Sequence, residues 1–166
     1  MLLPMDVRIC SDKARFGFVF AKRGIVPEAA SSWFLPRLIG ITKALELCYS
    51  GKIISSGEAK DINLVSEVLP QEKLIERAID IANEFTSESS QISIALTRQM
   101  MWRMLGADDP MEAHKIDSRG VYELGQSEEA IEGVKSFLEK RPPSFPGKVS
   151  KDMPSFYPWW VEKEFD

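Results

Sequence analysis

The chain has 166 residues and a formal net charge of −4. A nucleic-acid-binding domain needs a basic face to neutralise phosphates, so this charge argues against nucleic acid as a general partner. No apolar run reaches the ~18 to 20 residues that a membrane-spanning helix needs, and the first residues, MLLPMD, are too short and uncharged for a signal peptide. We therefore expect a cytoplasmic domain with a real hydrophobic core.

The first part of the chain is predicted to be rich in strands. Residues 6–10 and 16–20 are interpreted as strands, because Phe16, Phe18 and Phe20 alternate as on a half-buried strand. Gly24 permits a sharp turn after the second strand.

Helices and a short strand are expected next. A helix over residues 41–49 should be closed by Gly51, the residue type that accepts a left-handed conformation. Ser55 and Glu58 have capping-box spacing and predict a short helix to about residue 62. A strand at 64–69 is stopped by Pro70, and apolar periodicity predicts a helix over 71–85.

The polar segment TSESSQ, residues 86–91, is the best candidate for a domain boundary. Three helices are expected beyond it, over 92–105, 110–124 and 128–140, the last with Ser127 as N-cap. Prolines and aromatic residues then crowd the tail, which we expect to be extended and to lie across another surface, such as a neighbouring subunit. The predicted divisions are a core at 1–87, a helical region at 88–141 and a tail at 142–166.

Glu28 is the candidate for acid–base chemistry. It stands in a turn of small residues, before an amphipathic segment, where nothing bulky would block a ligand. The alternative is structural, because a carboxylate in the first turn of a helix gains a few tenths of a kcal/mol from the helix dipole. Cys10 and Cys48 stand singly, which predicts reduced thiols and neither a disulfide framework nor a metal site.

Three motifs in order resemble the crotonase (enoyl-CoA hydratase/isomerase) superfamily. MDVRICSDKARFGF is similar to the strand and turn written CDIRIAS with A-x-F-x-x-P, and SEEAIEGVKSFLEKRPPSF to the closing helix E-G-x-x-A-F-x-E-K-R-x-P-x-F. YSGKIISSGEAKDINLVSEVLP is similar to T-G-x-x-I-x-A-x-E-A-x-x-x-G-L-V-x-x-V-x-P, with Asn63 at a family glycine.

The resemblance implies a mixed, helix-rich α/β fold: the C-terminal part of a crotonase-like ββα spiral, followed by a helical trimerisation region. Family members are roughly half again as long. Two backbone N–H groups hold their thioester oxygen, and by the resemblance both precede Met1, so that this chain would start inside the helix that the second one opens. An oxyanion donor contributes about 3 to 4 kcal/mol to a barrier, so we expect the 166-residue polypeptide alone to be inactive or nearly so.

The resemblance also assigns roles to residues. Glu28 matches the base of some Δ3,Δ2-enoyl-CoA isomerases, whose loop reads G-L-x-x-E-G-G, and burial against Phe18, Phe20 and Trp33 is expected to raise its pKa. Hydratases usually use two glutamates, and Phe20 stands where one of them would be, which favours isomerisation.

Phe20 and three further residues are assigned to substrate binding. Trp33 is a candidate for the acyl pocket or for plain core. Phe137 matches a residue near the acyl chain, and Lys140 matches a lysine that in some members reaches the phosphates of coenzyme A on an adjacent subunit. A lysine at a helix C-terminus is also explained by the helix dipole.

Two functions follow. The first is an acyl-CoA-processing enzyme that shifts or hydrates the double bond of an enoyl-CoA thioester in fatty-acid metabolism, with no cofactor besides that substrate, and that is a homo-trimer or hexamer when complete. The second is a non-catalytic fragment that associates with full-length crotonase subunits.

Overall fold

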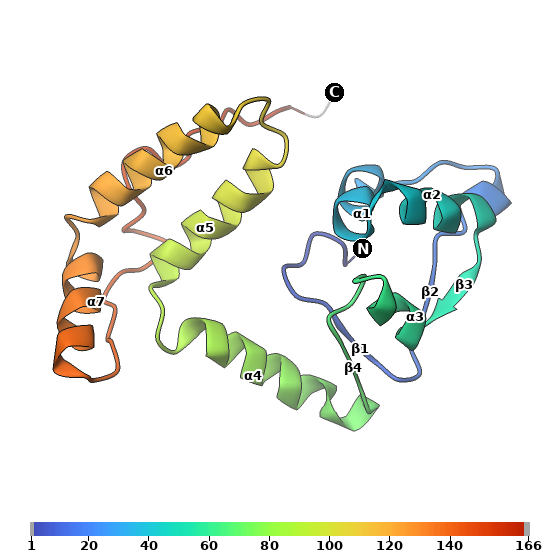
Figure 1. Ribbon diagram of the computed structural model, residues 1–166, viewed down its shortest axis with the longest axis horizontal. Coiled ribbons are helices and arrows are strands. Elements are labelled where there is room, and N and C mark those ends of the chain that lie inside the picture. Colours follow the sequence, from blue (N-terminus) through green and yellow to red (C-terminus); the bar gives the residue numbers. More distant parts are fainter. Residues whose placement is uncertain (1, 165–166) are drawn as a thin grey trace. The chain divides into compact units, whose positions relative to one another are not determined.

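The computed structural model describes residues 2–164 (Figure 1). The chain divides into two compact units, Met1–Ile81 and Ala82–Asp166. Short strands and helices build the first unit, whereas helices and a long irregular segment build the second. The predicted fold class, mixed α/β and helix-rich, is confirmed. Within residues 2–164, no helix is long and apolar enough to cross a membrane.

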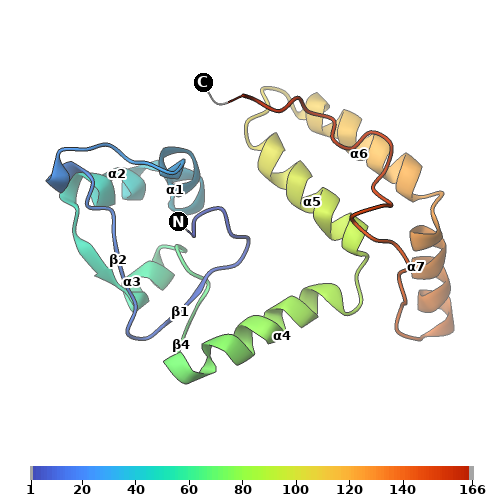
Figure 2. The same ribbon diagram turned by 180° about the vertical axis from the view of Figure 1, so that it is seen from behind.

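Two small two-stranded sheets lie in the first unit (Figures 1 and 2). Strand β1 (Ile9–Ser11) is parallel to β4 (Glu67–Leu69), and β2 (Arg15–Gly17) is antiparallel to β3 (Ile53–Ser55). The register places Cys10 opposite Val68 and Phe16 opposite Ile54. Both sheets therefore join the beginning of the chain to a segment about 40 to 60 residues later, which closes the unit.

The strand predicted over 16–20 is wrong at its end. It stops at Gly17, and Phe20 already has helical torsions (φ −53°, ψ −54°) at the entrance to the 3-10 turn η1 (Ala21–Arg23). The expected sharp turn at Gly24 is present, with φ at 72°. Residues 2–5 form a turn, with Met5 N–H donating to the Leu2 carbonyl, and not the expected helix.

Three helices cover these strands in the first unit: α1 (Ser31–Ile39), α2 (Ile41–Ser50) and α3 (Ser56–Asp61). Helix α2 ends at Gly51 in the left-handed region, as predicted. The predicted capping box starts α3: the Ser55 hydroxyl accepts from the Glu58 N–H, and the Glu58 carboxylate accepts from the Ser55 N–H. The core between helices and strands consists of buried residues from all of them: Cys10, Leu35, Ala44, Leu47, Ile54, Ala59, Leu64 and Val65.

The segment predicted as one helix over 71–85 begins with a 3-10 turn, η2 (Gln71–Lys73), and continues as α4 (Leu74–Thr86). Arg77 fastens this helix to β4, because its guanidinium donates two hydrogen bonds of 2.8 and 2.9 Å to the Glu67 carboxylate. Arg77 thereby holds the pKa of Glu67 below its usual range.

The three helices predicted for the second half are α5 (Gln91–Met104), α6 (Pro110–Leu124) and α7 (Glu128–Glu139). Ser127 caps α7 as predicted, because its hydroxyl accepts from the Ala130 N–H. Two large apolar side chains of α5, Ile92 and Leu96, are buried in this unit.

The tail after α7 lies on the helices of its own unit, which corrects the expectation that it crosses another surface (Figure 2). Three helix carboxylates accept backbone N–H bonds from it: Glu132 from Ser144, Glu129 from Gly147 and Glu123 from Ser155. The Arg103 guanidinium of α5 stacks 3.3 Å from the ring centroid of Trp160. The prolines prevent a regular helix or strand in the tail, so these N–H groups have no backbone partner there. The carboxylates of α6 and α7 accept their hydrogen bonds instead. Residues 165 and 166 lie outside the described part.

Acid should weaken the attachment of the tail to α7. Arg141 donates to both oxygens of the Glu132 carboxylate, at 2.6 and 2.8 Å, and with the Ser144 N–H it lowers the pKa of Glu132 to about 2. The folded-state pKa lies below the unfolded value, so the stabilisation is complete above an unfolded pKa of about 4.3 and is lost as the pH falls to about 2. In urea unfolding, we expect the free energy of unfolding of the wild type to exceed that of Glu132→Gln above this window, and the difference to disappear as the pH falls through it. A difference that stays constant from pH 6 to pH 2 would contradict the ion pair.

Candidate active site

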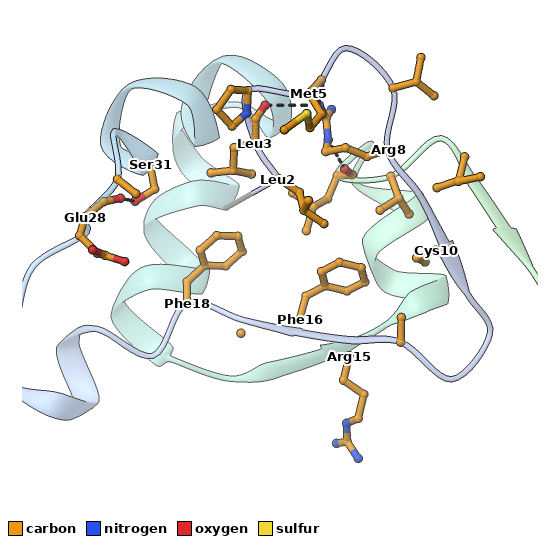
Figure 3. Close-up of a pocket in the computed structure, with 18 of the residues that line it drawn as sticks. Leu2, Leu3, Met5, Arg8, Cys10, Arg15, Phe16, Phe18, Glu28 and Ser31 are labelled. Atoms are coloured by element: carbon orange, nitrogen blue, oxygen red, sulfur yellow. Dashed lines mark hydrogen bonds between the residues drawn. The ribbon is translucent and has the colours of Figure 1, made fainter. Parts of the chain in front are cut away.

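A pocket of about 630 Å³ opens in the first unit between β2, the first residues of the chain and the segment before α1 (Figure 3). The rings of Phe16 and Phe18 point into it, facing Leu2 and Leu3 across the space, while Arg15 points away. Glu28 and Ser31 stand at one side. We call this space the main pocket. Its walls are mostly apolar, which suits a hydrocarbon chain next to a few polar groups.

Glu28 is the carboxylate among the described residues that line the main pocket. Its backbone carbonyl accepts a hydrogen bond of 2.5 Å from the buried Ser31 hydroxyl and a second of 2.9 Å from the Ser31 N–H. The backbone that carries the carboxylate is therefore tied to the first turn of α1. This holds the position of the Glu28 side chain relative to the helix.

The two residues after Glu28 have an unusual backbone. Ala29 and Ala30 both lie in the left-handed region, with φ at 51° and 56°. A side chain in this region costs about 1 to 2 kcal/mol, because Cβ approaches the following carbonyl oxygen. The double left-handed turn reverses the chain so that α1 can start at Ser31, beside the main pocket.

Glycine should fit this turn better than alanine. We expect Ala29→Gly to leave the free energy of unfolding unchanged or to raise it by up to about 1 kcal/mol, since relief of the left-handed strain offsets the greater chain entropy of glycine. Ala78→Gly, the same change on the exposed face of α4, should instead lower it by about 1 kcal/mol. Urea unfolding of both variants measures this, and equal losses would contradict the left-handed turn.

Burial of Glu28 against Phe18, Phe20 and Trp33 was expected, and this is wrong for the described chain. The Glu28 residue is exposed at the rim of the pocket, because the loop that carries it, residues 25–30, runs along the surface. Phe18 and Phe20 do line the pocket. Trp33 does not line the pocket. The Arg37 guanidinium, one turn later, stacks 4.0 Å from the centroid of the Trp33 ring, and the Phe34 ring contacts the Trp33 ring edge-on.

Phe137 and Lys140 belong to the second unit. Phe137 is 81% exposed on α7, so it is free to contact a ligand or another chain. The helix was predicted to include Lys140, but it ends at Glu139, and Lys140 follows as a left-handed cap with φ at 53°. Its N–H donates to the Phe137 and Ser136 carbonyls, which closes the helix. The assignment of both residues to substrate binding stays a prediction.

Two other groups in the main pocket are not available for proton transfer. The Arg8 guanidinium donates to the carbonyl oxygens of Met5 (2.5 Å) and Leu64 (2.8 Å) and so braces the wall. Burial raises the pKa of the Cys10 thiol, which therefore stays protonated. Within the described residues no group of three His, Cys, Asp or Glu side chains is arranged to hold a metal ion. Among the described lining residues, this leaves Glu28 as the one that carries a carboxylate.

Sequence reasoning missed a second pocket of about 370 Å³, which shares Phe20 and Ser31 with the main pocket. Loop residues 25–27, helix α1 and helix α2 all contribute to its walls. The contributing residues of α2 recur at the spacing of one helical face: Ile41, Ala44, Leu45, Cys48 and Tyr49. This periodicity is the sequence signal from which the apolar face of α2 at this pocket could have been predicted.

The family model described as enoyl-CoA hydratase/isomerase matches residues 1–148. The chain is similar to the enoyl-CoA hydratase ACTT3 of Alternaria alternata, with 41% identity over 146 residues. That match covers 87% of this chain and 49% of the relative. A probable enoyl-CoA hydratase of Bacillus subtilis (strain 168) is 36% identical over 149 residues, which cover 89% of this chain and 57% of the relative. The chain spans about half the length of the curated relatives it matches.

Solved structures agree with these matches. An enoyl-CoA hydratase from Bacillus anthracis has a TM-score of 0.82 at 32% identity, over 88% of this chain and 56% of that one. A probable enoyl-CoA hydratase/isomerase from Mycobacterium abscessus also has a TM-score of 0.82, at 28% identity, over 88% of this chain and 59% of that one.

Proposed function

The chain belongs to the enoyl-CoA hydratase/isomerase (crotonase) family, and from this premise we propose that it carries the proton-transfer half of an enoyl-CoA isomerase site, with Glu28 as the base. The observation that supports this most is the position of Glu28 as the carboxylate at the rim of a mostly apolar pocket. An acyl chain would fill the pocket, and its α-carbon would lie against the carboxylate.

One carboxylate suffices for moving a double bond. Glu28 takes a proton from C2 of a 3-enoyl thioester, and the electron pair of the broken C–H bond delocalises through the double bond and the thioester carbonyl. The same carboxyl returns the proton to C4, so that the double bond lies between C2 and C3. No proton is gained or lost overall, and general acid–base catalysis of this kind contributes about 10² to 10⁴ in rate.

Hydration has a different requirement, because one group must activate water while another protonates the α-carbon. Phe20, the residue at the expected position of a second glutamate, lines the pocket with an apolar ring. Among the described lining residues there is no second carboxylate beside Glu28. These observations favour isomerisation over hydration.

The other elements of the site are part of the same proposal. We assign the chain to the C-terminal portion of the family fold, with the oxyanion donors supplied by residues outside it. Phe137 and Lys140 of a neighbouring subunit would contact the acyl chain and the phosphates of coenzyme A, in a homo-trimer or hexamer. The 81% exposure of Phe137 supports a contact outside its own unit.

The test uses the gene product, by which we mean the complete protein with the residues that supply the oxyanion donors. It offers this protein two substrates, a trans-3-enoyl-CoA and a trans-2-enoyl-CoA, and follows products by chromatography. We expect conversion of the 3-enoyl thioester to the 2-enoyl thioester to be faster than formation of the 3-hydroxyacyl thioester. Hydration faster than isomerisation would overturn the assignment of Glu28 as a single base.

A second candidate function is association with full-length crotonase subunits without catalysis. An apolar face on α7 favours it, formed by Ile131, Val134, Phe137 and Leu138, which are all exposed. If this is the function, the 166-residue polypeptide will co-purify with an intact crotonase, and adding the half that supplies the oxyanion donors will not restore conversion of either substrate. Replacing Val134 with aspartate should then abolish co-purification.

A further inference from the structure

A pocket of about 250 Å³ lies in the second unit, between the first turn of α7 and the tail. Ile92 of α5 and Leu124 of α6 complete its lining. Three carboxylates line this space, those of Glu128, Glu129 and Asp152, and we call it the carboxylate pocket. Among its described lining residues there is no lysine or arginine, so the lining itself does not balance their charge.

Glu129 differs from the other two carboxylates because it is buried, with an exposed fraction of 7%. Glu128 and Asp152 are exposed, so they form the rim of the pocket and Glu129 forms its floor. The Oε1 atom of Glu129 accepts a hydrogen bond of 2.7 Å from the Gly147 N–H. The Oε2 atom is buried and has no hydrogen-bond partner within residues 2–164. A buried carboxylate oxygen without a donor is costly, so a donor at this atom would stabilise the unit.

The tail fixes the Glu129 carboxylate in this position. The backbone of Gly147 comes so close that an added Cβ would lie 2.8 Å from Oε1 of Glu129 and 2.5 Å from Cδ1 of Ile92. The nearby Ser127 hydroxyl is not a donor to Oε2, because it donates to the Leu124 carbonyl at 2.6 Å. The donor for Oε2 therefore has to come from a bound molecule.

The lining favours an ammonium group as this donor. Three carboxylates favour a cation over a neutral donor. A guanidinium binds a carboxylate best through both oxygens, but Gly147 already occupies Oε1, whereas an ammonium is a compact charge that needs only Oε2. Within the described residues no three His, Cys, Asp or Glu side chains are arranged to hold a metal ion. Ile92, Leu124 and Pro146 offer apolar surface to a hydrocarbon stem.

We propose that the carboxylate pocket binds the primary ammonium group of a small aliphatic amine, with one N–H donating to Oε2 of Glu129. The stem of the amine contacts the apolar side chains, and the rim carboxylates attract the charge. Because α7 and the tail both line the pocket, the bound amine joins them and stabilises the second unit. The site is independent of the proposed function, since none of its residues lines the main pocket.

The experiment titrates the gene product with n-butylammonium and measures the dissociation constant by saturation-transfer difference NMR. Tetramethylammonium, which has the same charge and five non-hydrogen atoms but no N–H, is the matched control ligand. We expect n-butylammonium to bind with a dissociation constant of about 1 mM, which is ordinary for so small a ligand. Tetramethylammonium should bind at least tenfold more weakly. The melting temperature should rise with n-butylammonium only, because the site exists in the folded state.

Two variants locate the site. Glu129→Gln keeps the size of the side chain and an acceptor for the Gly147 N–H, and it should weaken n-butylammonium at least tenfold, since a hydrogen bond to a charged group is lost. Asp152→Asn changes an exposed rim residue, so folding is not at risk, and should weaken binding about twofold to fourfold. Glu112→Gln is the matched control, because Glu112 is an exposed first-turn glutamate of α6 outside the pocket. It should leave the dissociation constant unchanged.

Four results would overturn the proposal. If the wild type does not bind n-butylammonium, or binds both cations equally, the pocket is not an ammonium site. Equal affinities of Glu129→Gln and Glu112→Gln would place the bound amine elsewhere. Displacement of n-butylammonium by an equal concentration of Ca²⁺ would make the pocket a metal site. Binding to Lys148→Ala but not to the wild type would mean that the exposed lysine beside Gly147 fills the pocket itself.

Discussion

Replacing Glu28 with glutamine is expected to lower the rate of isomerisation of a trans-3-enoyl-CoA by about 10² to 10⁴-fold. Glutamine keeps the size of the side chain and its place at the rim of the main pocket, but its amide cannot accept the proton from C2. The rate constant kcat carries the loss, because the carboxylate acts on the reacting carbon and not on the bulk of the thioester.

The measurement is steady-state kinetics on the gene product, with binding of a saturated acyl-CoA measured in parallel. The dissociation constant of this acyl-CoA for Glu28→Gln should lie within about twofold of the wild-type value, since the apolar walls hold the acyl chain. Its free energy of unfolding should also be unchanged, because the side chain is exposed and its backbone carbonyl makes the bonds to Ser31.

Glu72→Gln is the matched control. Glu72 is an exposed carboxylate of the same unit, in the turn η2, and it does not line the main pocket. Its substitution removes the same charge from the protein and should leave kcat as it is. If Glu28→Gln turns over as fast as Glu72→Gln, Glu28 has no part in the chemistry and the proposed mechanism must be abandoned.

Elements with a strong local signal could be predicted from the sequence almost to the residue. Helix α6 begins at Pro110 and ends at Leu124, as predicted, and the predicted capping box at Ser55 starts α3. Asn63, which stands at a family glycine, has φ at 60°. Asparagine is among the residue types that accept this region, so the substitution keeps the turn.

Elements that depend on distant partners could not be predicted. Strand β3 has three residues and pairs with β2. This pairing forms when the unit folds, and the local sequence pattern does not predict it. Periodicity predicted helix α4, but it did not predict which of its apolar residues are buried. Ile75 and Ile79 of its apolar face are exposed in the described structure.

The candidate site shows the same division. The small-residue turn pointed to Glu28, and the resemblance gave it a role. Neither could predict that the residue would be exposed at the rim of the main pocket and not buried inside it. Trp33 was a candidate for the acyl pocket or for plain core, as an aromatic residue on an amphipathic segment. In a helix, however, the facing direction changes by about 100° per residue, and Leu35 and Pro36 of the same helix, but not Trp33, are among the residues that line the second pocket.

Truncating Leu47 to alanine should destabilise the first unit more than any other substitution considered for it. Leu47 is 1% exposed and contributes to the core shared by α1, α2 and β3. Leucine-to-alanine changes in such cores cost about 2 to 5 kcal/mol, because burial is lost and a cavity remains. Since whole domains are stable by about 5 to 15 kcal/mol, this loss removes a large part of the stability of the unit.

Leu45→Ala provides the control within the same helix. It is the same chemical change two residues earlier, with the same gain in helix propensity, but Leu45 is 40% exposed. Its cost should stay below about 1.5 kcal/mol, because the side chain is only partly removed from water. Urea unfolding gives both values. If the two truncations cost the same, α2 does not face the core through Leu47. The side of α2 that is assigned to the second pocket would then be wrong as well.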